Sequence, residues 1–227
     1  MPAADDSPAT DFAVARAMMV DSQVRPNKVT DPRIIDAMRT IPRERFVPPA
    51  RHALAYSDED VPLGGGRFLM EPMVIGRLVQ LAAVQPGERV LVVGAGSGYG
   101  AALLAACGAT VTALEQDASL LALARSALAE VAPGVAVVEG KLAEGWRAGA
   151  PYDAILVEGA VPDVPAALAG QMTSHTGRLV AVLRPGARVG QAVLCTAVGG
   201  GRLNPRAMFD CAVPALPEMR REPGFVF

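Results

Sequence analysis

The sequence predicts an α/β protein with a doubly wound, mostly parallel sheet. Apolar β-rich segments alternate with helical patterns, and a cluster of glycines follows the first of these strands. Right-handed crossovers would join the strands into a Rossmann-like sheet, with a ligand crevice at their carboxyl ends. The expected parallel strands are Arg89–Val93, Thr110–Leu114, Val135–Val138, Tyr152–Val157 and Arg178–Leu183.

Capping signals mark two helices of this fold. Asp117 precedes an apolar helical pattern that runs to Val131, where a Pro-Gly pair ends it. A second helix is expected over Thr30–Arg39, which contains an Asp-Pro start. Near the other end of the chain, residues 191–197 and 206–213 flank a glycine-rich turn and predict an antiparallel hairpin at the sheet edge.

These elements divide the chain into two parts within one structural domain. Residues 1–75 are expected to form a mainly helical cap and substrate-side segment. Residues 76–227 are expected to form the ligand-binding core with its hairpin. With 227 residues, 51% of them hydrophobic, the chain is long enough for one well-buried domain plus such an accessory segment.

The composition argues against several functional classes. A formal net charge of −2 does not suggest a nucleic-acid surface. The first residues lack the pattern of a secretory signal, so a cytoplasmic location is expected. The charge-free stretch 90–114 is long enough to span a bilayer, but five glycines interrupt it, and we interpret it as buried β-α-β structure without membrane contact.

The cysteines and histidines do not predict a metal site. Cys107, Cys195 and Cys211 are widely spaced in apolar contexts, which favours buried thiols in a reducing compartment. The two histidines, His52 and His175, are too isolated to suggest zinc or a catalytic triad. No metal is therefore expected.

The glycine cluster after the first core strand is the main functional signal. Gly94, Gly96 and Gly98 permit positive φ and leave room for a ligand beside the backbone. A dinucleotide fingerprint needs its third glycine at position 99, which is Tyr99 here. The spacing G-x-G-x-G thus points away from NAD and toward S-adenosylmethionine.

Glu115 is the predicted ribose ligand. It ends the second core strand 21 residues after Gly94, close to the offset of about 20 residues at which an acidic side chain meets a ribose diol. The alternative is a helix-start carboxylate beside Asp117, stabilised by the dipole of the following helix.

Several motifs together resemble protein-L-isoaspartate O-methyltransferases, from about residue 20 to the terminal hairpin. The motifs are Ile41–Pro48, Ala55–Asp58, Val61–Gly64, Val90–Tyr99 and Pro151–Val157, in the order seen in that family. The resemblance implies a seven-stranded class I methyltransferase fold with S-adenosylmethionine as donor. It also implies methyl esterification of the α-carboxylate of isoaspartyl residues in damaged proteins. The ester closes to a succinimide, and some chains reopen as normal aspartate.

This chemistry explains why no catalytic constellation is visible. A carboxylate with a pKa of about 4 is already ionised at neutral pH and needs no general base. The enzyme mainly has to orient it toward the methyl group, and such orientation can lower a barrier by about 7–11 kcal/mol.

Five positions depart from the family pattern. Met70 stands where the family has a serine that touches the reacting carboxylate, and Glu71 adds a negative charge beside it. Lys141 replaces an aspartate beside the adenine amino group, Val92 occupies a common acidic position, and Glu158 replaces a threonine at a strand end. The alternatives are that Met70 is core, Lys141 is solvated, Glu71 starts the helix beginning at Pro72, and Glu158 pairs with Lys141 or an arginine.

We therefore expect an S-adenosylmethionine-dependent methyltransferase of the isoaspartate type, with isoaspartyl peptides or proteins as substrate and no nucleic acid or membrane as partner. The alternatives are a methyltransferase on this scaffold with another acceptor, or a catalytically decayed donor-binding protein. If Glu71 and Glu158 both face the crevice, repulsion should raise a pKa and favour a cationic acceptor. The predicted catalytic positions are Met70, Glu71 and Glu158, and the predicted donor-binding positions are Gly94, Ala95, Gly96, Ser97, Gly98, Glu115, Gln116, Lys141 and Leu142.

Overall fold

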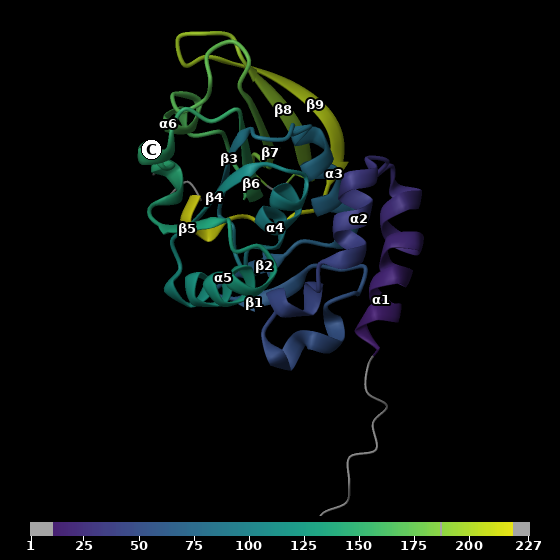
Figure 1. Ribbon diagram of the computed structural model, residues 1–227. Coiled ribbons are helices and arrows are strands. Elements are labelled where there is room, and N and C mark those ends of the chain that lie inside the picture. The colour runs from purple at the N-terminus through teal and green to yellow at the C-terminus, as the bar shows by residue number, and fades with distance from the viewer. Residues whose placement is uncertain (1–10, 187, 220–227) are drawn as a thin grey trace, which may run out of the picture.

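The computed structural model describes residues 11–186 and 188–219, and a twisted seven-stranded sheet forms its centre (Figure 1). The strand order is β5-β4-β3-β6-β7-β8-β9, and a separate hairpin pairs β1 with β2. The five neighbouring strands β5, β4, β3, β6 and β7 run parallel, whereas β8 and β9 are antiparallel to their neighbours. The strands are β1 Val61–Gly64, β2 Arg67–Leu69, β3 Arg89–Val93, β4 Thr110–Glu115, β5 Ala136–Glu139, β6 Ala154–Val161, β7 Arg178–Leu183, β8 Gly190–Ala197 and β9 Leu203–Cys211.

The predicted doubly wound fold and its antiparallel C-terminal hairpin are confirmed. Two strands have the predicted bounds, and β6 continues four residues beyond its predicted end at Val157. That extension carries Glu158 and contains an irregularity in the pairing with β7 between Leu156 and Ala160.

The helices begin where the capping residues predict. Asp117 accepts hydrogen bonds from the backbone N–H groups of Ser119 at 2.8 Å and Leu120 at 3.0 Å and so caps α5. Asp31 caps α2, whose first residue is Pro32. The α-helices are α1 Phe12–Met19, α2 Pro32–Thr40, α3 Pro72–Ala82, α4 Tyr99–Ala106, α5 Ala118–Val131 and α6 Ala166–Ala169. Short turns of other helix types are Val20–Val24 (π) and the 3₁₀ segments Arg25–Asn27, Arg43–Phe46, Pro49–Leu54, Leu142–Glu144, Arg147–Gly149 and Pro217–Met219.

Alternate residues of the central strands face two different hydrophobic clusters. In β3, Val90 and Val92 belong to the larger cluster, which includes buried residues of helices α1 to α5. Leu91 and Val93 belong to the second, which includes Leu168 of α6 together with Leu216 and Met219. The C-terminal segment therefore contributes to the cover on one face of the sheet.

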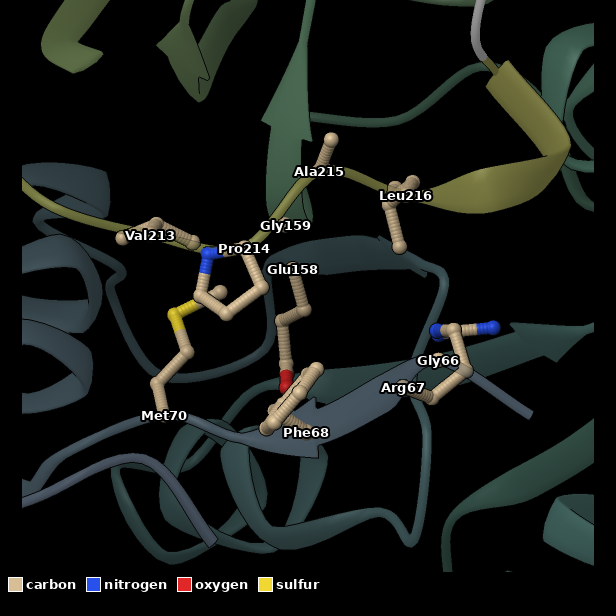
Figure 2. Close-up of a pocket in the computed structure, with 10 residues that line it drawn as sticks. All are labelled: Gly66, Arg67, Phe68, Met70, Glu158, Gly159, Val213, Pro214, Ala215 and Leu216. Carbon is tan, nitrogen blue, oxygen red and sulfur yellow. The ribbon is translucent and has the colours of Figure 1, made fainter. Parts of the chain in front are cut away.

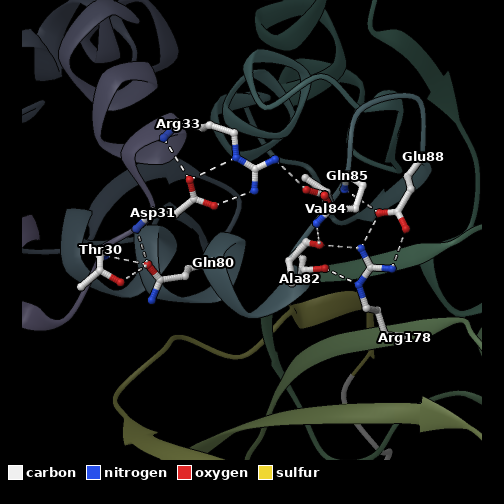
Figure 3. Close-up of polar contacts among 10 residues, drawn as sticks. Thr30, Asp31, Arg33, Gln80, Ala82, Val84, Gln85, Glu88 and Arg178 are labelled. Atoms are coloured by element: carbon white, nitrogen blue, oxygen red, sulfur yellow. Dashed lines mark hydrogen bonds and ion pairs between the residues drawn. The ribbon is translucent and has the colours of Figure 1, made fainter.

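Polar contacts tie the N-terminal helices to the core (Figure 3). Gln80 of α3 accepts from the backbone N–H of Thr30 at 2.7 Å and of Asp31 at 3.0 Å. Arg33 of α2 donates to the carbonyl oxygen of Val84 at 2.9 Å. The predicted boundary between residues 75 and 76 falls inside α3, and the division into cap and core stays a prediction.

The three cysteines are buried and free, as predicted. No group of three or more His, Cys, Asp or Glu side chains in the described residues is arranged to hold a metal ion. Among residues 11–186 and 188–219, no helix has the length and apolar character needed to cross a membrane.

Candidate methyl-donor and acceptor site

The glycine loop lies where β3 ends and α4 begins. Gly94, Gly96 and Gly98 have φ values of 69°, 56° and 95°, which side-chain-bearing residues rarely adopt. A Cβ on Gly98 would lie 2.7 Å from a methyl group of Leu128, so α5 packs closely against the turn. Glycine is required here by backbone conformation and by packing.

Glu115 lies at the carboxyl end of β4, beside this loop, and its side chain is fully buried. Its Oε1 accepts hydrogen bonds from the backbone N–H of Gln116 at 2.7 Å and of Asp117 at 3.0 Å. Its Oε2 accepts from the backbone N–H of Gly96 at 2.8 Å. The carboxylate therefore joins the glycine loop to the start of α5.

Arg67 of β2 occupies the remaining face of this carboxylate. Its Nη1 and Nη2 each donate to one oxygen of Glu115 at 2.9 Å, and Nη2 also donates to the carbonyl oxygen of Gly94 at 2.8 Å. The Arg67 side chain is 3% exposed. Burial by itself would lower the pKa of the Arg67 guanidinium. The hydrogen bonds and negative charge of Glu115 outweigh this effect and raise the pKa above its ordinary value, so the guanidinium stays charged.

The segment 213–219 covers the paired side chains of Arg67 and Glu115. Glu218 pairs with Arg67 Nη1 at 3.2 Å. The backbone of Leu216 donates to the carbonyl oxygen of Ala160 at 2.9 Å, which attaches the segment to β6. A Cβ on Gly94 would lie 3.2 Å from the side chain of Leu216, and one on Gly159 would lie 2.4 Å from it. The space that these glycines leave is thus filled by Leu216.

What remains of the crevice here is a cavity of about 10 Å³, about the size of one water molecule (Figure 2). The residue types fit an S-adenosylmethionine site, because a glycine loop meets an acidic strand end at a helix N-terminus. The described conformation is closed, with Arg67 and Leu216 in the crevice. The lining residues are Gly66, Arg67, Phe68, Met70, Glu158, Gly159 and Val213–Leu216.

Met70 and Glu158 meet at this cavity. Met70 is 4% exposed and belongs to the larger hydrophobic cluster, in agreement with its interpretation as core. The carboxyl oxygen Oε1 of Glu158 is buried and has no hydrogen-bond partner. Burial raises the pKa of Glu158 to about 8, while Arg67 lowers it and Glu115 raises it.

Glu71 lies elsewhere, so the hypothesis of an acidic pair with Glu158 is wrong. Glu71 does not line the cavity, and its pKa is raised by burial and by the charges of Asp60 and Asp58. Its backbone N–H donates to Asp60 Oδ1 at 2.9 Å. The raised pKa of Glu158 follows from its own burial, since Glu71 is not among the charges that act on it.

The remaining predicted donor positions lie around the crevice with different exposures. Lys141 is exposed and pairs with Glu144 at 3.1 Å, as the solvated alternative expects. Gln116 is exposed, and its side-chain oxygen accepts from the backbone N–H of buried Leu142 at 3.3 Å. Ser97 is buried with an unpaired hydroxyl, and Ala95 is buried within the glycine loop. Contact of these residues with a donor stays a prediction.

Sequence reasoning missed the roles of Arg67, Leu216 and Glu218 at Glu115 and the glycine loop. Arg67 and Glu115 are 48 residues apart, and Arg67 and Glu218 are 151 apart. No local pattern signals such pairs. The one available signal is an arginine in the segment preceding Met70, which by itself suggests only a contact for the substrate.

The sheet order, the glycine loop and the acidic end of β4 define a Rossmann-like, S-adenosylmethionine-dependent methyltransferase. The profile of the protein-L-isoaspartate(D-aspartate) O-methyltransferase family matches residues 15–196. The chain therefore belongs to the protein-L-isoaspartate O-methyltransferase family.

Curated relatives and solved structures agree with this membership. The chain is 40% identical over 203 residues to a protein-L-isoaspartate O-methyltransferase of Koribacter versatilis, covering 89% of this chain and 90% of that protein. It is 42% identical to one of Methylorubrum extorquens, covering 78% of each. A solved protein-L-isoaspartate O-methyltransferase has a TM-score of 0.76 at 22% identity, covering 88% of this chain and 65% of that one. A Plasmodium falciparum structure in complex with S-adenosyl-L-homocysteine has a TM-score of 0.74 at 17% identity, covering 89% and 98%. The two structures support the fold.

Proposed function

We propose that this protein transfers a methyl group from S-adenosylmethionine to the α-carboxylate of isoaspartyl residues in damaged proteins. The observation that carries the proposal is the contact between Glu115 and the backbone of Gly96, which sets an acidic strand end against the glycine loop. We further propose a cytoplasmic location, isoaspartyl peptides or proteins as substrate, and no nucleic-acid or membrane partner.

The donor, when bound, supplies an electrophilic methyl group on sulfur. The acceptor carboxylate is ionised at neutral pH, so the chain has to orient it and exclude water more than activate it. We place the acceptor at the cavity beside Met70 and Glu158, whose wall also includes Arg67, the residue that binds the carbonyl oxygen of Gly94. The side chains of Arg67 and Leu216 would have to move out of the crevice to admit the donor, while the backbones of the β1–β2 hairpin and of residues 213–216 would shield the reaction from solvent.

Gly96→Val tests the donor site. A β-branched side chain is strained at a φ of 56°, and its bulk would enter the crevice beside Leu63, whose methyl group lies 3.5 Å from the position of a Cβ. We expect at least a tenfold loss of affinity for S-adenosylhomocysteine by calorimetry, and a matching loss of labelled-methyl transfer to an isoaspartyl peptide. Gly134→Ala is the control, because Gly134 has open space around it. Equal donor affinity in Gly96→Val and wild type would contradict the assigned site.

Met70→Ser tests the transfer of the family's serine position to this chain. A serine hydroxyl can donate a hydrogen bond that methionine cannot. We expect turnover on an isoaspartyl peptide to hold or rise, with a stability cost of about 2–3 kcal/mol from the apolar volume removed. A large loss of turnover at a temperature where the variant stays folded would show that Met70 itself is needed.

A different acceptor on the same scaffold is the second candidate function. Glu158 favours it where its carboxyl group is ionised, above its pKa of about 8, because an ionised Glu158 would repel a carboxylate and attract a cation. Labelled-methyl assays with an isoaspartyl peptide, its aspartyl counterpart and an amine acceptor separate the two functions. Donor binding without transfer to any acceptor would indicate a decayed enzyme.

A further inference from the structure

The carboxyl group of Glu158 stands out among buried polar groups of the described residues. Its Oε1 is buried and makes no hydrogen bond, although Glu158 lies within β6, one residue past the point where the pairing of β6 with β3 ends at Val157. A buried polar atom without a partner destabilises the fold. Such a group, just beyond the end of the pairing between two parallel strands, is a candidate for a contact that forms only when a ligand is present.

Glu158 and Met70 line the same cavity. Figure 2 shows the Glu158 side chain extending from β6 toward Phe68, between Met70 and Arg67 in this view. The Glu158 carboxyl also contacts the start of α4, because a Cβ on Gly100 would lie 2.0 Å from its Oε1. Met70 stands where the resemblance places the serine that touches the reacting carboxylate. A hydrogen-bond donor is therefore missing at Met70, while Glu158, close by, lacks a partner.

Two guanidinium groups, those of Arg67 and Arg43, act on Glu158, but in the described part of the chain neither forms an ion pair with its carboxyl group. Arg67 of β2 is bound to Glu115 and Glu218. Arg43 donates to the carbonyl oxygens of Ala55 at 2.7 Å and Met70 at 2.5 Å. These two guanidinium groups lower the pKa of Glu158, and Glu115 raises it, but burial dominates and raises it to about 8. At neutral pH the group is mainly a neutral carboxylic acid, which can donate an O–H hydrogen bond.

We propose that Glu158 is a contact for the acceptor, and that its neutral carboxyl group donates a hydrogen bond to one oxygen of the isoaspartyl α-carboxylate. The inference rests on the proposed function. The proton stays on Glu158 throughout, and the second oxygen of the acceptor carboxylate stays free to form the bond to the methyl group. Glu158 thereby supplies the hydrogen-bond donor that the thioether of Met70 cannot provide, and it is repulsive only when ionised.

The test compares steady-state kinetics on an isoaspartyl peptide from pH 6.5 to 9.5. For wild type, we expect the KM for the peptide to rise about tenfold or more as pH passes through about 8, because Glu158 loses its donor and gains a like charge. Glu158→Gln keeps an N–H donor at every pH, so this rise should disappear. Glu158→Leu has no donor and should show a KM about tenfold higher than wild type at pH 7, with a smaller change in kcat.

Glu130→Gln is the matched control, because Glu130 is an exposed carboxylate of α5 that pairs with Arg45. It should keep the wild-type dependence of KM on pH.

Unfolding measurements check that Glu158 titrates in the folded protein. The Glu158 carboxyl group keeps its proton up to about pH 8 in the folded state but only to about pH 4.5 in the unfolded state. The free energy of unfolding due to this group therefore decreases as the pH rises from about 4.5 to about 8. Glu158→Gln should remove that part of the pH dependence.

Three outcomes overturn the proposal: Glu158→Gln keeps the wild-type rise in KM, Glu158→Leu keeps the wild-type KM at pH 7, or Glu130→Gln removes the rise. Absence of turnover by wild type with donor binding intact would overturn the proposed function instead. Peptide binding by calorimetry in the presence of S-adenosylhomocysteine then decides the role of Glu158. Binding kept in Glu158→Gln and abolished in Glu158→Leu upholds it, and equal or absent binding in all three proteins overturns it.

Discussion

Replacing Glu115 by alanine is expected to lower the free energy of unfolding by about 3–5 kcal/mol. The change leaves the guanidinium of Arg67, 3% exposed, as a buried cation without the carboxylate that neutralises it. It also removes the acceptor for the backbone N–H groups of Gly96, Gln116 and Asp117. If Glu115 served only as a ribose ligand, its removal would weaken donor binding and leave the fold intact; its buried contacts predict a loss of stability as well.

Urea unfolding followed by circular dichroism measures the effect. Glu139→Ala is the matched control, because Glu139 ends the neighbouring strand β5 but is exposed, so its loss should cost under about 0.5 kcal/mol. The double change Arg67→Met with Glu115→Leu should recover part of the loss, since it leaves no unpaired charge. A loss below about 1 kcal/mol in Glu115→Ala would show that the pair with Arg67 adds little to the fold.

The sequence predicts the central sheet and the helix starts because these depend on local patterns. Strand β3 alternates side chains between two hydrophobic clusters, and its apolar run is bounded by Arg89 and the glycine loop. Asp31 and Asp117 act through backbone N–H groups two or three residues away. Such short-range physics is readable from one chain.

The arrangement within the crevice depends on contacts between distant segments and was not predictable. Glu115 at the end of β4 satisfies the spacing for a ribose ligand whether or not an arginine from β2 binds it. Leu216 resembles any apolar residue near a chain end, yet it packs on Gly159. The backbone N–H of Glu71 is held by Asp60, which lies on the other side of the β1–β2 hairpin in sequence.

Arg67→Gln is expected to tighten the binding of S-adenosylhomocysteine by about tenfold or more. A donor whose ribose hydroxyls bind Glu115, as predicted, competes with the two hydrogen bonds from Arg67 to that carboxylate. Hydrogen bonds to charged groups contribute about 1.5–3 kcal/mol, and about 1.4 kcal/mol corresponds to a factor of ten in affinity. Glutamine is too short and uncharged to reproduce the paired contact, so the competition weakens.

The fold should tolerate Arg67→Gln better than Glu115→Ala, because Glu115 keeps three backbone N–H donors when the guanidinium is gone. Calorimetry with S-adenosylhomocysteine measures the affinity, and Arg51→Gln, a change at an exposed arginine of the 3₁₀ segment Pro49–Leu54, is the control. Removal of the Glu218 contact by Glu218→Gln should act in the same direction with a smaller effect, since it frees only one bond to Arg67. Weaker donor binding in Arg67→Gln would mean that the guanidinium holds Glu115 in its binding position, and that Arg67 supports the donor site without competing for it.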